Sequence, residues 1–113
     1  MLNQSTDIDL LFQALADPTR RLMIELMSGG PVAASNFAKP CDISLPAVLQ
    51  HLKLLEGCGL VRSEKRGRVR HCMLETAAFA RIERWVEERR MSWHRQLDQL
   101  EQILAEDETG DSP

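Results

Sequence analysis

The spacing of apolar residues along the first part of the chain predicts two amphipathic helices. Over residues 7–16 apolar side chains recur every three or four positions, which is the period of one helix face. This first stripe consists of Ile8, Leu11, Phe12 and Leu15. Asp17 and Pro18 mark the start of a second helix, because aspartate caps helix N-termini and proline fits the first turn. The second stripe, which Gly29-Gly30-Pro31 ends, consists of Leu22, Met23, Leu26 and Met27.

The next segment predicts a short helix, a tight turn and a longer capped helix. Residues 34–39 can form the short helix, which Pro40 breaks. Ser44 then caps a helix that tolerates Pro46 in its first turn and closes at Gly57. Its buried face is expected at positions four and seven apart: Val48, Leu52 and Leu55. Two helices joined in this way form a helix-turn-helix pattern.

A basic two-stranded hairpin is predicted after this pattern. Residues 60–65 and 69–75 alternate in polarity and are rich in valine, leucine and arginine. Between them, Arg66-Gly67-Arg68 predicts a turn centred on the glycine.

Residues 76–105 predict one long helix whose apolar stripe is longer than a small monomer can cover. The stripe consists of Phe79, Ile82, Val86, Trp93, Leu97, Leu100 and Leu104. A seam between two copies of the chain is therefore expected. We predict one domain over 1–113, with an ordered core over 7–105 and an acidic, disordered tail over 106–113.

Length and composition narrow the classes of function. With 113 residues, 43% of them apolar, the chain suits one small core and has no room for a separate catalytic domain. It has neither an apolar run of about 18 residues nor the basic, apolar start of a signal peptide. A cytoplasmic protein with no membrane partner is expected. Cys41, Cys58 and Cys72 are an odd number at wide spacings, which fits neither a disulfide framework nor a Cys-x-x-Cys zinc site.

The distribution of charge favours a nucleic-acid surface despite a net charge of −3. Residues 62–70 carry five basic side chains and one acid, whereas the chain from Glu106 onward carries four acids and no base. Attraction to phosphates depends on the local field and not on the total charge.

Four motifs in this order resemble the ArsR/SmtB family of bacterial winged-helix repressors. They are ALADPTR at 14–20, SLPAVLQHL at 44–52, LEGCGLV at 55–61 and RGR at 66–68. The likeness covers roughly residues 8–104. It implies a mainly α fold with a small β-hairpin, a winged helix-turn-helix of order α-α-α-α-β-β-α. It also implies a homodimer joined by the first and last helices, with double-stranded DNA as its partner.

The chain departs from the metal-binding members of that family. Ala33-Ala34-Ser35-Asn36-Phe37 stands where those members have a thiolate pair, and His94 is the only histidine of the last helix. With Trp85 and Trp93, the chain is more similar to a branch without metal sites. We therefore expect no metal and no cofactor, and any small-molecule inducer is unknown. The two tryptophans are expected in dimer packing, with the lining of an inducer pocket as the alternative.

The capped helix and the hairpin supply the candidate DNA contacts. Gln50 can pair bidentately with adenine, and Lys53 suits a phosphate. The hairpin cations suit phosphates through counterion release. The alternatives are an ordinary amphipathic helix and a solvated hairpin in which Arg62 and Arg70 pair with Glu64 and Glu75. The expected DNA-binding residues are Ser44, Pro46, Ala47, Gln50, His51, Lys53, Lys65, Arg66, Arg68 and Arg70.

The first and last helices supply the candidate dimer contacts. These are Ile8, Leu11, Phe12, Leu15, Val86, Trp93, Leu97, Leu100 and Leu104. Arg20 has two open roles: its side chain can touch a phosphate, or it can lock the turn at Asp17 through a salt bridge.

The function expected is that of a sequence-specific DNA-binding repressor that binds an inverted repeat as a homodimer. The alternative is a repressor of the same fold that senses a thiol oxidant, a metal or a small molecule. A third class is a protein-interaction module that kept the fold without DNA affinity. An enzyme is not expected, because no catalytic constellation or phosphate-binding loop is present.

Overall fold

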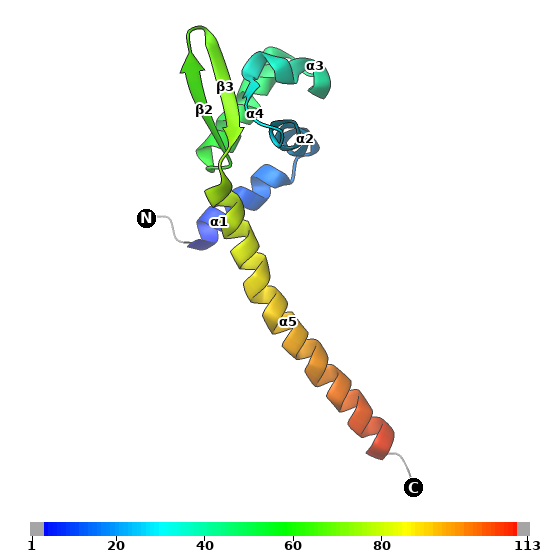
Figure 1. The fold of residues 1–113 in the computed structure, drawn as a ribbon. Coiled ribbons are helices and arrows are strands. Elements are labelled where there is room, and N and C mark those ends of the chain that lie inside the picture. Colours follow the sequence, from blue (N-terminus) through cyan, green and yellow to red (C-terminus); the bar gives the residue numbers. More distant parts are fainter. Residues whose placement is uncertain (1–3, 111–113) are drawn as a thin grey trace. The chain divides into compact units, whose positions relative to one another are not determined.

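The computed structural model describes residues 4–110, which form helices and one small sheet (Figure 1). The elements are α1 (Gln4–Leu15), α2 (Pro18–Met27), β1 (Val32–Ala33), the 3-10 turn η1 (Ala34–Phe37), α3 (Ala38–Cys41), α4 (Leu45–Gly57), β2 (Val61–Arg66), β3 (Val69–Leu74) and α5 (Thr76–Gly110). The chain divides into two compact units, Met1–Ile82 and Glu83–Pro113. Among the described helices, none is long and apolar enough to cross a membrane. The predicted mainly helical fold with a small hairpin is confirmed.

The predicted start of the second helix is confirmed in atomic detail. The Asp17 side chain accepts a hydrogen bond from the backbone N–H of Arg20 at 3.0 Å, and Pro18 occupies the first turn. The carboxylate thus satisfies one of the N–H groups that a helix start leaves unpaired. Only part of the predicted apolar stripe of α2 is buried, since Met23 and Met27 are enclosed but Leu22 is 40% exposed.

The expected break at Pro40 is wrong. Residues 34–37 form η1, and α3 then runs through Pro40 to Cys41. The proline is tolerated because the first N–H groups of a helix have no acceptor within it, so its missing N–H costs nothing there. The chain turns instead at Asp42, whose φ of 54° and ψ of 47° lie in the left-handed region. Aspartate is one of the few residues besides glycine that adopt this conformation readily.

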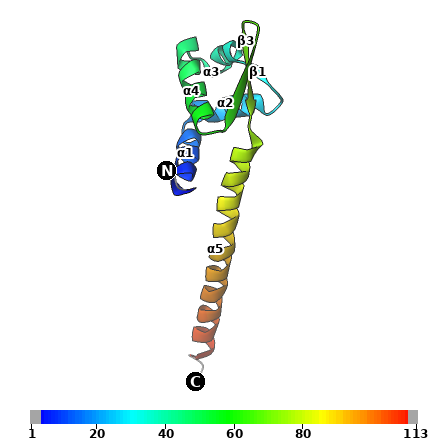
Figure 2. The same ribbon diagram turned by 90° about the vertical axis from the view of Figure 1, so that its left-hand side faces the viewer.

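The sheet has three antiparallel strands in the order β1-β3-β2. The hairpin β2–β3 turns at Gly67, whose φ of 64° suits a residue without a side chain. The strand β1, which was not predicted, pairs Val32 with Cys72. Two residues are too short to show an alternating pattern. In Figures 1 and 2 the turn of the hairpin lies at the end of the sheet away from the start of α5.

One core holds the first unit together. The side chain of Phe37 is fully buried between the short helical turns and α4, and the first turn of α5 contributes Ala78. Figure 2 shows α2 beside the sheet, where it packs against β3. The buried apolar residues are Leu11, Ala14, Met23, Met27, Ala34, Phe37, Val48, Leu52, Leu55, Leu60, Val61, Cys72 and Ala78.

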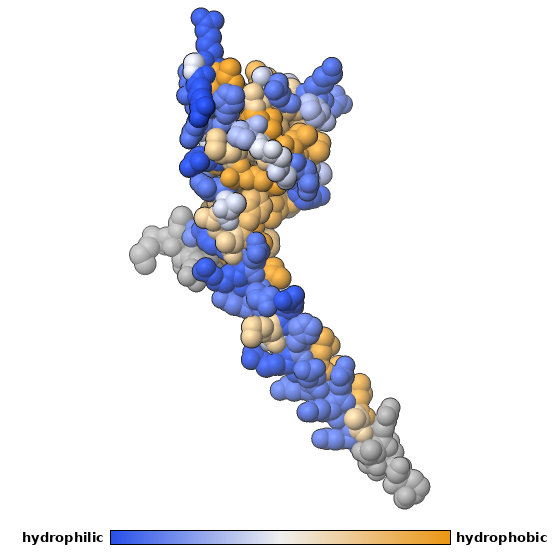
Figure 3. Space-filling model, viewed as in Figure 1, coloured by the Kyte–Doolittle hydropathy of each residue, from blue (hydrophilic) through white to orange (hydrophobic). Residues whose placement is uncertain are grey.

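The last helix continues beyond its predicted end. The expectation of a disordered tail from residue 106 is wrong for residues 106–110, which extend α5 to Gly110, while 111–113 lie outside the described residues. Extending an existing helix costs far less free energy than starting one, even through the aspartate, threonine and glycine of this segment. Figure 3 shows apolar side chains along one edge of α5 and polar side chains across the face toward the viewer.

The cap at Asp17 predicts a pH-dependent contribution to stability. The hydrogen bond from the Arg20 amide, aided by the charge of that residue, lowers the pKa of Asp17 below its usual 3.8, although partial burial opposes this. Because the folded pKa is the lower one, the ionised carboxylate stabilises the fold above about pH 4 and this contribution is lost in more acidic solution. Asp17→Ala should lower the free energy of unfolding by about 1 kcal/mol at neutral pH.

In urea unfolding, the free energy of unfolding of Asp17→Asn should be lower than that of wild type at neutral pH, and this difference should become smaller below about pH 4. Asp9→Asn, on the exposed side of α1, is the control and should show no such change. A difference in the free energy of unfolding between wild type and Asp17→Asn that is constant with pH would contradict a stabilising charge at Asp17.

Candidate nucleic-acid interface

The helix α4 begins at the serine predicted to cap it. The Ser44 hydroxyl accepts a hydrogen bond from the backbone N–H of Ala47 at 3.3 Å, and Pro46 lies in the first turn. The left-handed residue Asp42 lies two positions before this cap. Together the turn and the cap fix where α4 starts and the direction in which it leaves α3.

The two faces of α4 are sharply divided. Val48, Leu52 and Leu55 are at most 2% exposed and pack in the core. Of the candidate DNA contacts on this helix, Ala47 and His51 are half-buried and the remaining ones are exposed. The exposed candidates are Ser44, Pro46, Gln50 and Lys53. The structure thus leaves four of the six predicted positions of this helix exposed and two half-buried.

Three leucines of α4 share this exposure and were not predicted as contacts. Leu45, Leu49 and Leu54 are between 42% and 46% exposed. In the sequence, Leu45 and Leu49 lie three or four positions from core residues, so the helical period alone assigns them to the buried stripe. Their exposure gives this surface an apolar component beside Gln50.

The tip of the hairpin is the most cationic part of the sheet. Lys65, Arg66 and Arg68 flank Gly67 and are exposed. In the part of the chain that the structure describes, Lys65 and Arg68 form no ion pair, and Arg66 only approaches Glu64 at 3.8 Å. An exposed pair at that distance contributes little, so these charges stay available to a partner. Figure 3 shows the hydrophilic surface of this hairpin.

Strand alternation decides which hairpin arginines are engaged within the chain. Arg70 pairs across the ladder with Lys65 and therefore faces away from Glu64, which pairs with His71. The expected pairing of Arg70 with Glu64 or Glu75 is wrong for this reason. Its guanidinium instead lies 3.9 Å from the Glu56 carboxylate of α4 and donates to the Ser63 hydroxyl at 3.0 Å.

The other predicted cross-strand pair is present. Arg62 lies 3.9 Å from the Glu75 carboxylate, on the outer face of the sheet. Arg70 is thus engaged by Ser63 and Glu56, whereas the exposed Arg62–Glu75 pair contributes as little as the Arg66–Glu64 pair at the tip.

Arg20 makes no side-chain ion pair with Asp17 within residues 4–110, so the expected salt bridge is absent, whereas its contact with a phosphate stays a prediction. Its Nε donates to the Ala14 carbonyl at 2.7 Å and one terminal nitrogen donates to the Gln13 carbonyl at 2.9 Å. The other terminal nitrogen lies 3.4 Å from Nδ1 of His51 on α4. The side chain therefore binds carbonyl groups at the C-terminal end of α1 and also reaches the candidate DNA surface on α4. Spacing along the chain gives no signal for a contact between residues 31 positions apart.

The three cysteines do not converge. Cys72 is fully buried, and burial, with a smaller effect from the Glu56 charge, raises the pKa of its thiol to about 11. Burial also raises the pKa of Cys41, and the Cys58 thiol donates to the Leu55 carbonyl. Within residues 4–110, no group of three or more histidine, cysteine or acidic side chains is placed to hold a metal ion.

The candidate dimer contacts differ in exposure. Leu11 is fully buried within the first unit, so its assignment to an interface is wrong: it has no surface to offer a partner. Ile8 and Leu15 are half-buried and Phe12 is 37% exposed. The α5 candidates are between 41% and 56% exposed: Val86, Trp93, Leu97, Leu100 and Leu104. Met91 and Ile103, which were not predicted, are exposed to a similar degree.

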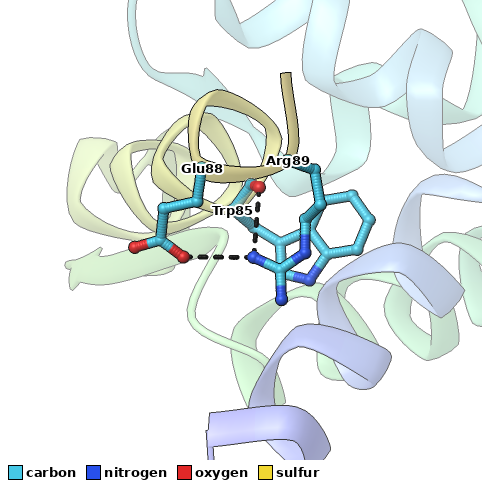
Figure 4. A network of polar contacts seen from close by, with 3 residues as sticks. All are labelled: Trp85, Glu88 and Arg89. Carbon is cyan, nitrogen blue, oxygen red and sulfur yellow. Dashed lines mark hydrogen bonds and ion pairs between the residues drawn. The ribbon is translucent and has the colours of Figure 1, made fainter. Parts of the chain in front are cut away.

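Trp85 is covered by a neighbour on its own helix (Figure 4). The Arg89 guanidinium lies over the ring at 4.5 Å from its centroid, donates to the Trp85 carbonyl and approaches Glu88 at 3.1 Å. This cation–π contact occupies one face of the indole. Trp93, in contrast, is 48% exposed.

Known proteins similar to this chain share both its sequence and its fold. A helix-turn-helix domain family matches residues 15–64. The HTH-type transcriptional regulator Rv2034 of Mycobacterium tuberculosis is 39% identical over 74 residues, which are 66% of this chain and 69% of that protein. The transcriptional repressor SdpR of Bacillus subtilis is 29% identical over 76 residues, 67% of this chain and 84% of that protein.

A crystal structure of an ArsR family transcriptional regulator is 40% identical and superposes with a TM-score of 0.76. The match covers 83% of this chain and 97% of that one, which includes α4 and the hairpin. The chain therefore belongs to the ArsR family of helix-turn-helix transcriptional regulators.

Proposed function

We propose that the protein is a cytoplasmic, sequence-specific DNA-binding repressor that binds an inverted repeat as a homodimer. The observation that carries this proposal is the exposed face of α4, fixed by its cap and its buried stripe, together with the free cations at the hairpin tip. Repression follows the similarity to SdpR. A dimer of helix-turn-helix domains binds two half-sites about one helical turn apart.

The chemistry of α4 suits the major groove. Gln50 offers both a donor and an acceptor, which is the pattern that adenine presents on its groove edge. The exposed Leu45 and Leu49 can contact thymine methyl groups, and the small Ala47 permits close approach. Lys53, three residues from Gln50 along the helix, is placed for a phosphate.

The hairpin supplies affinity without sequence preference. Lys65, Arg66 and Arg68 are exposed cations around one turn, as phosphate binding with counterion release requires. A protein-interaction module without DNA affinity has no need of such a concentration of charge beside a polar helix face.

A sensor based on these cysteines has less support. A reactive thiol is exposed and has a lowered pKa, whereas Cys72 is buried and its pKa is raised to about 11. An enzymatic role has no support either, because the family consists of transcriptional regulators.

The homodimer rests on the apolar stripe of α5. Trp93, Leu97 and Leu100 are about half exposed each, at the spacing of one helix face. A partner copy that covers this face removes apolar surface from water. The half-buried residues Ile8 and Leu15 of α1 are proposed as further contacts.

The proposal is tested by selection of duplexes from a random pool by the full chain, followed by titration of the selected duplex at several salt concentrations. Enrichment of an inverted repeat, with affinity that falls steeply with salt, is expected. If the protein enriches no sequence but binds all duplexes alike, sequence-specific repression is wrong. If it binds no duplex at low salt, DNA binding itself is wrong.

Gln50→Ala should remove discrimination at one base position of each half-site, at a cost of about 1–3 kcal/mol for the preferred base. Binding to unrelated duplexes should be unchanged, because phosphate contacts carry no sequence information. The measurement is the ratio of affinities for the selected duplex and for single-base variants of it. Gln102→Ala on α5 is the matched control. An unchanged ratio of affinities for Gln50→Ala would show that Gln50 does not recognise a base.

Replacing both Arg66 and Arg68 by alanine should weaken binding to all duplexes alike and lower the salt slope by about four, because each protomer of the proposed dimer loses two phosphate contacts. Arg84→Ala with Arg95→Ala removes the same charge from exposed positions of α5 and serves as the control. Equal losses in the two double variants would show an effect of overall charge and not of the hairpin tip.

Leu97→Glu with Leu100→Glu should shift the protein from dimer to monomer, because two charges would enter the seam that we propose. Sedimentation equilibrium measures the state, and circular dichroism reports whether the helices persist. Gln102→Glu lies on the opposite side of α5 and should leave the dimer intact. A double variant that stays dimeric would place the interface elsewhere.

A further inference from the structure

We propose that Arg20 fixes the tautomer of His51, so that the imidazole presents its Nε2–H from α4 as a hydrogen-bond donor to DNA. This inference rests on the proposed function and adds a role for two residues. His51 was predicted as a contact at the margin of the helix face, without any indication of which ring nitrogen carries the proton.

The contact between Arg20 and His51 determines which ring nitrogen carries the proton. A guanidinium carries five N–H donors and no acceptor, so a nitrogen facing it must be unprotonated to form a hydrogen bond. The atom that faces Arg20 at 3.4 Å is Nδ1 of His51. In a neutral imidazole the proton is then on Nε2, because the hydrogen bond at one ring nitrogen determines the state of the other.

Hydrogen bonds to the end of α1 and to Asp17 hold Arg20 in place. Its side chain donates at 2.7 Å to Ala14 and at 2.9 Å to Gln13, at the end of α1. Its backbone N–H is bound by Asp17 at 3.0 Å. A side chain held at two points, on a backbone anchored at a third, loses little further freedom when it binds the imidazole, so the contact with His51 is preorganised.

The other ring nitrogen of His51, Nε2, is accessible to a ligand. His51 is half-buried, and within residues 4–110 its Nε2 has no hydrogen-bond partner. Nε2 of His51 is not among the fully buried side-chain atoms of that part of the chain that lack a hydrogen bond, so it retains contact with solvent. One turn before His51 stands Ala47, whose small side chain leaves room for a ligand.

The ligand that fits is a hydrogen-bond acceptor of DNA. Phosphate oxygens and the N7 and O6 atoms of guanine are such acceptors. His51 directly follows Gln50 on the helix, so its donor extends the surface that we propose for base reading. Arg20 is here a positioning residue, and His51 is the group that touches DNA.

The tautomer is tested on the free protein by long-range proton–nitrogen NMR of the imidazoles, with His51 assigned through His51→Ala. We expect a protonated Nε2 and an unprotonated Nδ1 in wild type, and a mixture of tautomers in Arg20→Gln. A protonated Nδ1 in wild type would overturn the inference, as would the same tautomer population in Arg20→Gln. Because Arg20→Gln removes bonds to α1 and can unfold the chain, Arg20→Lys is measured beside it.

DNA binding is tested with His51→Gln and His51→Asn on a duplex selected by wild type. A glutamine amide reaches the position of Nε2 and can replace its donor, whereas an asparagine amide reaches only as far as Nδ1. We therefore expect near-wild-type affinity for His51→Gln and, for His51→Asn, a loss of about tenfold per half-site, the value of one hydrogen bond, and so of about a hundredfold for the dimer. Equal affinities for the two variants would overturn the donor role.

The pattern of the loss identifies the acceptor. A uniform loss across duplexes indicates a phosphate, and a loss confined to duplexes with one particular base indicates that base. If wild type binds no duplex, the proposed function fails and the donor role with it, while the NMR result on the tautomer still stands. If wild type binds and His51→Asn binds equally well, only the inference about His51 fails.

Discussion

The burial of Val48, Leu52 and Leu55 determines the direction of everything on the other side of α4. These side chains are at most 2% exposed, so the helix cannot rotate about its axis without bringing apolar surface into water. Removal of one such leucine side chain costs about 2–5 kcal/mol, which is a large part of the stability of a small domain. The position of Gln50 on the solvent side of α4 therefore follows from the core, whereas His51 is also held by its contact with Arg20.

The sheet applies a similar constraint to its arginines. Alternation sends Arg70 to the face that meets α4, where Glu56 and Ser63 bind it, and leaves Arg62 on the outer face beside Glu75. The residues around Gly67 lie beyond these acidic partners, apart from the weak contact between Arg66 and Glu64. Of the charge along residues 62–70, Arg70 is thus held against α4, whereas the cations at the tip remain available.

Most of the fold could be predicted from local rules, whereas the contacts between distant elements could not. The caps at Asp17 and Ser44, the turn at Gly67 and the buried stripe of α4 each follow from residues a few positions apart. The exposure of Leu45 and Leu49 depends on how wide a strip the core covers, which the helical period does not give. Pairs such as Arg20 with His51, or Arg70 with Glu56, depend on how elements pack and have no signature in spacing.

The division of α4 into a structural face and an exposed face has a consequence for how such proteins diversify. Because Ser44, Asp42 and the buried stripe hold the helix, exposed positions such as Gln50 and Lys53 can mutate with little effect on folding. Gene duplicates can therefore acquire new operators through a few substitutions on one helix and keep the rest of the domain. The exception is His51. Because its ring contacts Arg20 of α2, substitutions at these two positions of α4 and α2 depend on each other.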